Sequence, residues 1–288
     1  MKVYYNCGSC FLKQAHEALE IATDDDNLRL EVLSKIFKLI AEEYQADASS
    51  NKLGTHMHRL IKKETLQEDL FIEDKERCNK LATSFLPKVN EMIKENNDLE
   101  TYIKIAIVGN LLDSVTLGIG SKTEQTIAEN LEKELAINDI QDFEKTLNHV
   151  DSVLYLADNT GEIVFDKLLI QKLLEYDVKV TFAVKDKPIL NDACMKDALD
   201  IGLDEVAELV TTGTDSVGIV YEDLSEEFRD RFDNAEMIIS KGLGNYEGIT
   251  ELKNTNNPIF FLLSVKCQAI AKDIGAEMGS NVLKKYYN

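Results

Sequence analysis

The sequence predicts an α/β fold, with a mostly parallel sheet covered by helices on both faces and an all-helical domain before it. Two observations lead to this prediction. After residue 150, short apolar runs alternate with helical patterns, as is typical of right-handed βαβ units. Before residue 150 such runs are few, and apolar residues recur at helical spacing instead. We therefore expect a helical domain over residues 1–95 and an α/β domain over residues 96–288.

The helical stretches of the first part follow from apolar spacing. They are expected at residues 17–44, 55–70, 74–87 and 98–119. Within the first of them, Leu28, Val32 and Ile36 fall on one helix face. Asp24, Asp25 and Asp26 supply a candidate N-cap there, because side-chain oxygens and negative charge stabilise the first turn of a helix.

Five short apolar runs of the second part are predicted strands. They read SVLYLA, DVKVTFAV, ELVTTG, AEMIIS and PIFFLLS, and they begin at residues 152, 177, 208, 235 and 258. Helical spacing follows the first run at residues 163–176. It also follows the last run at residues 265–276, where Ser264 is a candidate N-cap.

The charge balance excludes several classes of partner. The 288 residues include 32 Lys and Arg against 52 Asp and Glu, a net charge of −20, which repels nucleic acid and anionic membrane surfaces.

No apolar run approaches the roughly 20 residues of a membrane span, and no signal-peptide pattern opens the chain. Five cysteines, an odd number, fit a reducing compartment. We expect a cytoplasmic protein, monomeric or a small homo-oligomer.

Polar side chains gather in the loops that follow the predicted strands. In chain order these loops carry Asp158, Asn159, Gly161 and Glu162; Asn191 and Asp192; Thr214, Asp215 and Ser216; and Lys241, Gly242, Gly244, Asn245 and Glu247. In an open parallel sheet such loops lie beyond the carboxyl ends of the strands, where ligands bind. We expect the four loops to converge on one cleft.

The residue types in these loops suit a metal and an anion. Asp158, Asn159 and Asp192 are hard oxygen donors, which favour Mg²⁺ or Mn²⁺ over a structural zinc ion. Two carboxylates leave open positions on such an ion for phosphate oxygens. Lys241 adds a positive charge, and the glycines at 242 and 244 let backbone N–H groups approach an anion. These devices would offset the net charge of −20 for an anionic substrate.

Several of these segments resemble a known family. LADNTGEIVFDKLL, VKDKPILNDA, SKGLGNYEGI and FFLLSVKCQAIAKDIG are similar to the motif series of the metal-dependent damage-control phosphatases, catalogued earlier as domain of unknown function 89. NCGSCFLKQA and GNLLDSV resemble the smaller, archaeal-type branch of that family. The resemblance runs in order over nearly the whole chain. It implies a Rossmann-like core and hydrolysis of phosphate monoesters of small metabolites, either sugar phosphates or damaged phosphometabolites, with a bound Mg²⁺, Mn²⁺, Co²⁺ or Ni²⁺.

The resemblance also implies roles for individual residues. Asp158, Asn159 and Asp192 fall where the family has metal ligands, and Asp158, Asp192 and Lys241 are the expected catalytic residues. Lys241 falls at the phosphate-binding lysine. The expected substrate-binding residues are Asn110, Asp113, Gly161, Glu162, Asn191, Asp215, Lys241, Gly242, Gly244 and Asn245. The nucleophile is either a metal-oriented water or Asp158, and Glu162 and Asp215 are candidates to position that water or to hold a sugar hydroxyl. Thr160 departs from the family, which usually has Ala there.

Other interpretations remain open from the residues alone. The segment from Asp158 to Gly161 also fits a simple Asx turn. An S-adenosylmethionine-dependent carboxyl methyltransferase is an alternative function, although no loop carries a GxGxG run. A non-catalytic module for a metal or a phosphorylated ligand is another. Cys7 and Cys10 form a CxxC pair that fits redox or metal use less well than packing, and His56 and His58 are expected on a solvated face.

Overall fold

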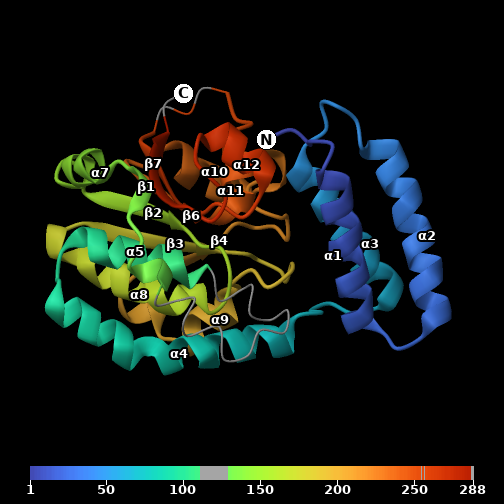
Figure 1. The fold of residues 1–288 in the computed structure, drawn as a ribbon, viewed down its shortest axis with the longest axis horizontal. Coiled ribbons are helices and arrows are strands. Elements are labelled where there is room, and N and C mark those ends of the chain that lie inside the picture. Colours follow the sequence, from blue (N-terminus) through green and yellow to red (C-terminus); the bar gives the residue numbers. More distant parts are fainter. Residues whose placement is uncertain (111–128, 254, 256, 287–288) are drawn as a thin grey trace.

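Seven strands form one sheet in the computed structural model, which describes residues 1–110, 129–253, 255 and 257–286. The strand order is β1-β7-β6-β5-β2-β3-β4 (Figure 1). The strands are β1 (Leu135–Asn138), β2 (Ser152–Leu156), β3 (Lys179–Val184), β4 (Glu208–Thr211), β5 (Ile238–Lys241), β6 (Ile259–Ser264) and β7 (Asn281–Tyr286). Neighbouring strands pair in parallel, except that β6 and β7 are antiparallel. The predicted α/β fold is confirmed.

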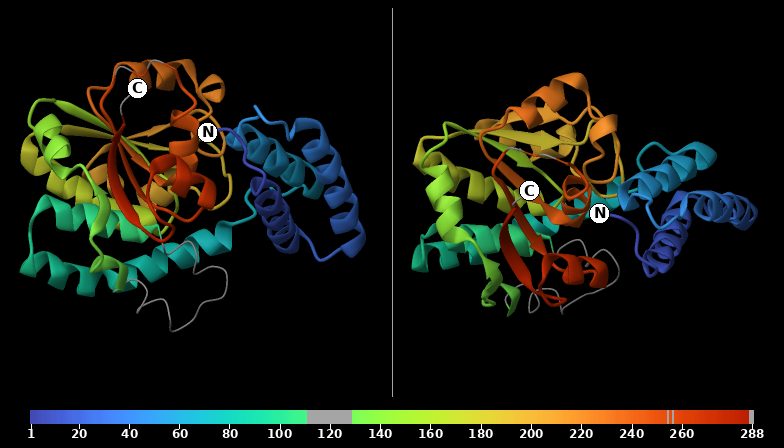
Figure 2. Two further views of the ribbon diagram at one scale, coloured as in Figure 1. Left: turned by 45° about the horizontal axis from the view of Figure 1, so that its top comes forward. Right: turned by 90° about the horizontal axis from the view of Figure 1, so that it is seen from above.

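Helices cover both faces of this sheet (Figure 2). One face carries α5 (Leu99–Gly109), α7 (Ile140–Leu147), α8 (Glu162–Leu173) and α9 (Met195–Asp200), and the other carries α10 (Glu226–Asp233), α11 (Gly242–Ile249) and α12 (Gln268–Ile274). Short 3-10 helices lie at Leu174–Tyr176, Leu203–Glu205 and Tyr221–Asp223. Successive strand residues enter opposite cores: Phe260 packs with the first set of helices and Phe261 with the second.

The five predicted strands are present, and two further strands were not predicted. β1 is a short strand of four residues at one edge of the sheet, and lysines interrupt the apolar pattern of its neighbour β7. The predicted N-cap at Ser264 is wrong. Ser264 is the last residue of β6, where its hydroxyl donates to Asn281 of β7, and the helix begins only after Cys267.

The N-terminal helices form two groups. The first three, α1 (Cys7–Ala22), α2 (Asp26–Glu43) and α3 (Ser50–Thr65), share their own apolar cluster and stand beside the α/β part (Figure 1). Asp25 caps α2 as predicted, because its Oδ1 accepts from the backbone N–H of Asn27 at 2.9 Å. The fourth helix, α4 (Ile72–Glu95), packs against α5 and α8 instead. The boundary at residue 95 stays a prediction, and the packing places α4 with the α/β part.

Polar contacts from α3 hold the two parts together. Lys62 Nζ donates to Asp215 Oδ2 at 2.6 Å and to the Pro188 carbonyl at 2.8 Å. Arg59 Nε donates to the other Asp215 oxygen at 2.8 Å. Asn51 Nδ2 donates to the carbonyl of Gly244 at 2.8 Å. The helix thus contacts the loops that follow β3 and β4 and the first turn of α11. No helix within the described ranges has the length and apolar content to cross a membrane.

The Asp215 contacts lead to a prediction about stability. Asp215→Ala leaves Arg59 and Lys62 without their shared partner at a largely buried position, so the free energy of unfolding should fall by about 2 kcal/mol. Asp200→Ala is the control, since its pair with Lys196 is a solvent-exposed i, i+4 contact that should cost at most about 0.5 kcal/mol. Denaturant unfolding of both variants measures the difference. Equal losses would show that Asp215 does not join the two parts.

Candidate functional site

The site lies where the strand order reverses. From β2 the chain continues to β3 and β4 on one side, whereas β5 and β6 lie on the other side of β2. In open α/β sheets the crevice at the carboxyl ends of two such strands is the usual ligand site. Asp158 follows β2, and Lys241 is the last residue of β5. These two predicted residues therefore flank the crevice.

Backbone hydrogen bonds join the two loops that carry the predicted metal ligands. The Ala193 N–H donates to the Asp158 carbonyl at 2.9 Å, and the Thr160 N–H donates to the Asn191 carbonyl at 3.0 Å. Asn159 and Asp192 form a β-bridge between these bonds. The two loops thus form a short antiparallel pairing just beyond the parallel pair β2 and β3. Asp158, Asn159 and Asp192 are brought together, with Asn159 and Asp192 buried and Asp158 partly exposed.

The Asp158 carboxylate lies over the start of α11. A Cβ placed on Gly242 would come within 1.8 Å of Asp158 Oδ2, and Gly242 has a φ of +77°. Only glycine fits this position, both sterically and conformationally. Asp158 Oδ2 also accepts from Asn110 Nδ2 at 2.8 Å and from Asn159 Nδ2 at 3.1 Å. These contacts hold the carboxylate beside the positive end of α11.

The residues present fit a hard divalent ion. In the described part of the chain no three His, Cys, Asp or Glu side chains gather as a metal site. The ligands available here are two carboxylates and the Asn159 amide. The amide nitrogen donates to Asp158, so the amide oxygen is the atom suited to binding an ion. Magnesium-type ions commonly use one or two carboxylates and complete their coordination with water and phosphate oxygens. The donor set therefore suits such an ion and does not suit zinc.

Lys241 does not point into this crevice. Its side chain is fully buried, and its Nζ donates to Asp166 Oδ1 at 2.6 Å, to the Ala106 carbonyl at 2.9 Å and to Glu162 Oε1. Glu162 Oε2 accepts from Asn110 Nδ2 at 2.8 Å. The predicted phosphate contact of Lys241 therefore needs correction. Two buried carboxylates attract the ammonium inward, and it supports Asp158 only through Glu162 and Asn110.

The ionisation of this cluster follows from its burial. Burial alone would lower the pKa of Lys241, but Asp166 and Glu162 outweigh it and hold the pKa above its ordinary value. Burial raises the pKa of Asp166 to about 6, against the opposing effect of Lys241. Tyr155 donates its hydroxyl to Asp166 Oδ1 at 2.7 Å, and its pKa is raised chiefly by burial. One ammonium thus faces two carboxylates in a site without water contact.

The other predicted substrate-binding residues have varied positions. Glu162 and Asp215 are engaged with cations, so neither is placed as expected to hold a sugar hydroxyl or a water. Asn245 Nδ2 donates to the carbonyls of Ala157 and Lys241, which fixes α11 against β2. The Gly161 N–H donates to Asn79 of α4, and Gly244 lies against α3. Asp113 lies outside the described residues.

Two lysines that sequence reasoning did not single out lie at the site. Lys185 follows β3, is almost fully buried, and places its Nζ 3.6 Å from Asp192 Oδ2. Lys266 follows β6, and its Nζ donates to the carbonyl of Asn110. Lys185 lies one residue after a predicted strand, and Lys266 lies two residues after another. That position in the sequence was the signal that could have identified them.

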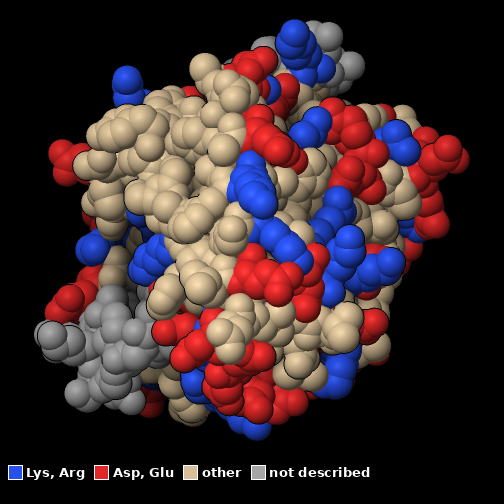
Figure 3. Space-filling model, turned by 90° about the vertical axis from the view of Figure 1, so that its right-hand side faces the viewer, with Lys and Arg blue, Asp and Glu red and all other residues tan. Residues whose placement is uncertain are grey.

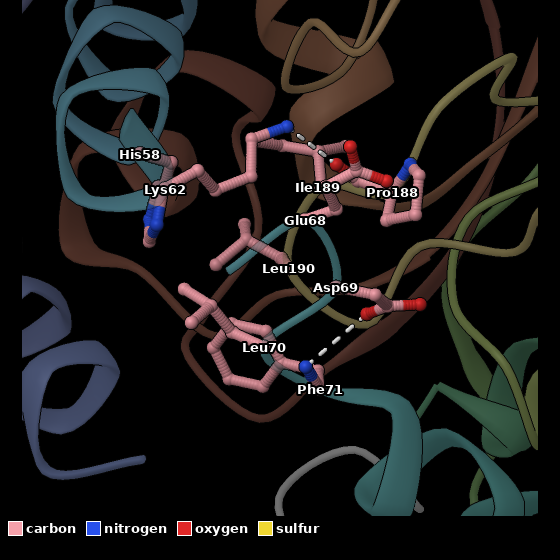
Figure 4. Close-up of a pocket in the computed structure, with 9 residues that line it drawn as sticks. All are labelled: His58, Lys62, Glu68, Asp69, Leu70, Phe71, Pro188, Ile189 and Leu190. Atoms are coloured by element: carbon pink, nitrogen blue, oxygen red, sulfur yellow. Dashed lines mark hydrogen bonds between the residues drawn. The ribbon is translucent and has the colours of Figure 1, made fainter. Parts of the chain in front are cut away.

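A small pocket lies beside the loop that leads to Asp192 (Figure 4). It is lined by His58 and Lys62 of α3 and by Pro188, Ile189 and Leu190, and its volume of about 10 Å³ suits a single water. His58 is buried, and burial lowers its pKa to about 4. The solvated position predicted for His58 is therefore wrong, whereas His56 is exposed.

Comparison with known proteins identifies the family. The family model described as the damage-control phosphatase ARMT1-like domain matches residues 3–282. The chain belongs to this family. A crystal structure of a DUF89 family protein from Pyrococcus horikoshii superposes with a TM-score of 0.89 and 32% identity, and the match covers 100% of both chains. The predicted family resemblance is thus confirmed.

Curated relatives of the ARMT1-like family cover nearly the full chain. A damage-control phosphatase of Archaeoglobus fulgidus is 32% identical, covering 99% of this chain and 99% of the relative. A damage-control phosphatase of Pyrococcus horikoshii is 33% identical, covering 98% and 97%. A protein of Methanocaldococcus jannaschii, named as uncharacterized, is 36% identical, covering 99% and 96%.

Gly242 provides a test of the site geometry in this ARMT1-like domain. Gly242→Ala forces a methyl group into the Asp158 carboxylate, so it should destabilise the protein by more than Gly275→Ala. Gly275 is the matched control, because its φ of +81° carries the same backbone strain, about 1 kcal/mol, with no atom within 4 Å of the added Cβ. The difference between the two free energies of unfolding measures the contact with Asp158. Equal destabilisation would contradict the close approach.

Asp166 provides a test of the buried cluster. The folded protein keeps a proton on Asp166 up to about pH 6, whereas the unfolded chain loses it near the usual 3.8. A raised pKa in the folded state means that stability falls as pH rises, here between about pH 4 and pH 6. Relative to Asp166→Asn, the wild type should lose about 3 kcal/mol over this range. Denaturant unfolding at several pH values checks this, and parallel pH profiles for the two proteins would contradict it.

Proposed function

We propose that the protein is a metal-dependent phosphatase that hydrolyses phosphate monoesters of small metabolites. The observation that carries the proposal is the backbone pairing that joins Asp158 and Asn159 to Asp192 at the strand-order reversal. The named activity of the Archaeoglobus and Pyrococcus relatives supports it. Sugar phosphates and damaged phosphometabolites are the substrate classes we propose to test first.

The residues around the crevice have complementary roles in this proposal. A divalent ion bound by Asp158, Asn159 and Asp192 would supply Lewis-acid charge for a phosphate oxygen. Lys185, beside Asp192, contributes positive charge to a second phosphate oxygen, and the N-termini of α8 and α11 add their dipoles. Positioning and electrostatics account for most of the catalysis of phosphoryl transfer.

Hydrogen bonding to Asp158 bears on the nucleophile. Its Oδ2 accepts from both Asn110 and Asn159, which holds the carboxylate in one orientation and lowers its electron density for attack. A water is therefore the nucleophile that we propose. Asn110 is a positioning residue, since Glu162 and Lys241 fix it from the protein interior.

The charge on one face of the molecule bears on the class of substrate. On the described part of the face that looks outward from α1–α3, acidic and basic side chains are intermixed, and no broad basic patch is visible (Figure 3). Nucleic-acid binding requires such a patch or stripe. Because the net charge is −20, we propose that Lys185 and Lys266, the lysines beside the crevice, supply the positive charge for an anion.

The experiment is a phosphate-release assay on a phosphometabolite panel with Mg²⁺, Mn²⁺, Co²⁺ and Ni²⁺ in turn. Asp158→Ala and Asp192→Ala should each lower the metal-dependent rate at least about 100-fold, because each removes a carboxylate ligand. Asp186→Ala, in the same loop as Asp192 but exposed, is the matched control and should retain activity. Methyl transfer from labelled S-adenosylmethionine is assayed in parallel.

Two results would contradict the proposal. Phosphate release that persists in both the Asp158 and the Asp192 variants would remove the metal assignment. Methyl transfer without phosphate release would favour the methyltransferase alternative. Circular dichroism of each variant confirms that a lost rate is not a lost fold.

A further inference from the structure

A larger cavity lies between the three-helix part and the α/β part. It has a volume of about 520 Å³ and is bordered by α1 and α3 on one side and by α11 and the segment after β6 on the other. Its wall includes Cys7, Cys10, Phe11, Leu190, Leu243 and Lys266. We refer to it as the interdomain cavity. None of the predicted metal ligands lines it.

Three segments connect the wall of the interdomain cavity with the predicted metal ligands or with residues that contact them. Leu190 directly precedes Asn191 and Asp192. Leu243 directly follows Gly242, whose Cα lies under the Asp158 carboxylate. Lys266, on the third segment, donates to the carbonyl of Asn110, whose side chain holds Asp158. A phosphate at Asp158 and Asp192 would therefore have the cavity as its neighbouring space.

The lining chemistry indicates the kind of group that fits. Neutral amides contribute hydrogen-bonding groups, and they are Asn6, Gln14, Asn51 and Gln268. Phe11, Leu190 and Leu243 provide apolar surface. Among the described lining residues Lys266 is the one cation, and the Glu247 carboxylate accepts from Ser50 at 2.7 Å. The wall thus suits an uncharged organic group with hydroxyls or amides, and does not provide for a second phosphate.

The size of the cavity limits the class of ligand that it can bind. Small-molecule sites occupy about 300–1,000 Å³ and combine apolar walls with a few polar groups. A triose is far smaller than the interdomain cavity, whereas a sugar joined to a planar amide-bearing ring has a suitable size and polarity. Asn51 is almost fully buried, and its Oδ1 has no hydrogen-bond partner within the described structure.

The geometry points to the interdomain cavity as the binding site for the alcohol part of the substrate, an uncharged nucleoside-like group. This inference rests on the proposed function, since the phosphate is placed at the metal ligands. It also gives the CxxC pair a role. Cys7 and Cys10, from α1, form the cavity wall together with Cys267, which lies after β6.

The state of the thiols supports a wall rather than a reactive pair. Cys7 Sγ accepts from the backbone N–H of Tyr4 at 3.3 Å, and Cys10 Sγ accepts from Gln14 Nε2 at 3.3 Å. Desolvation raises the pKa of both thiols. Redox and metal-binding cysteines instead have lowered thiol pKa values. The CxxC pair therefore fits ligand contact better than catalysis.

The first test compares substrates of different size. Glycerol 3-phosphate and uridine 5′-monophosphate are assayed with the same metal, and kcat/KM should be at least about tenfold higher for the nucleotide. Cys10→Phe fills the cavity from an exposed position on α1, so it should raise KM for the nucleotide about tenfold and change KM for glycerol 3-phosphate less than twofold. Lys13→Phe adds the same side chain outside the cavity and should change neither.

The second test does not depend on turnover. Alkylation of Cys10 by iodoacetamide is followed by mass spectrometry with uridine, with inorganic phosphate, or with no addition. Uridine should slow the labelling at least about fivefold, since it would cover the cavity wall, and inorganic phosphate should not. Cys10→Phe confirms the labelled position.

Each outcome bears on a separate claim. Absence of hydrolysis of either ester would contradict the proposed function, and the labelling result would then decide on the cavity alone. Equal KM changes in Cys10→Phe and Lys13→Phe, or labelling of Cys10 that uridine does not slow, would overturn the assignment of the interdomain cavity.

Discussion

The backbone pairing of two loops is the constraint on which the rest of the site depends. β2 and β3 pair in register up to Leu156 and Ala183, and the Ala157 N–H continues the ladder to the Ala183 carbonyl. The loops beyond then remain hydrogen-bonded to each other through residues 158–160 and 191–193. The backbones of two segments from distant parts of the chain are thereby held together, and side-chain hydrogen bonds from Asn110 and Asn159 then orient the Asp158 carboxylate.

The second physical problem is charge. Two carboxylates at one crevice in a protein of net charge −20 would repel an anionic substrate. The structure places lysines inside the fold around this crevice. Lys185 contacts Asp192, Lys266 contacts the Asn110 backbone, and Lys241 offsets Glu162 and Asp166 in the interior. Low dielectric strengthens each of these interactions relative to a surface pair.

The sequence predicts where the metal-ligand loops lie, but it does not predict where every side chain of the site points. Strand-ending polar residues predicted the convergence of Asp158, Asn159 and Asp192, because parallel topology alone fixes where such loops lie. The direction of a long side chain is set by tertiary partners instead. Lys241 turns inward because its ammonium group bonds to the buried carboxylates of Glu162 and Asp166. Both carboxylates come from α8, which covers one face of the sheet. Local sequence contains no sign of that pairing.

The burial of single polar residues likewise could not be predicted from the sequence. His56 and His58 stand two apart on α3, so they face different directions, and tertiary packing buries His58, whose Nε2 lies 3.5 Å from Gln14 Oε1 of α1. The strand β7 was missed because lysines interrupt its apolar pattern, and one of its two partners, β1, lies far away in the chain. The alternative of a simple Asx turn at Asp158 accounts for the local conformation but does not explain the bonds to residues 191–193.

The most direct measurement is the position of a metal in crystals grown with Mn²⁺, located from anomalous diffraction. We expect one strong peak within about 2.5 Å of oxygens from Asp158, Asn159 and Asp192, at the carboxyl ends of β2 and β3. A peak elsewhere, or none at these side chains at saturating Mn²⁺, would contradict it.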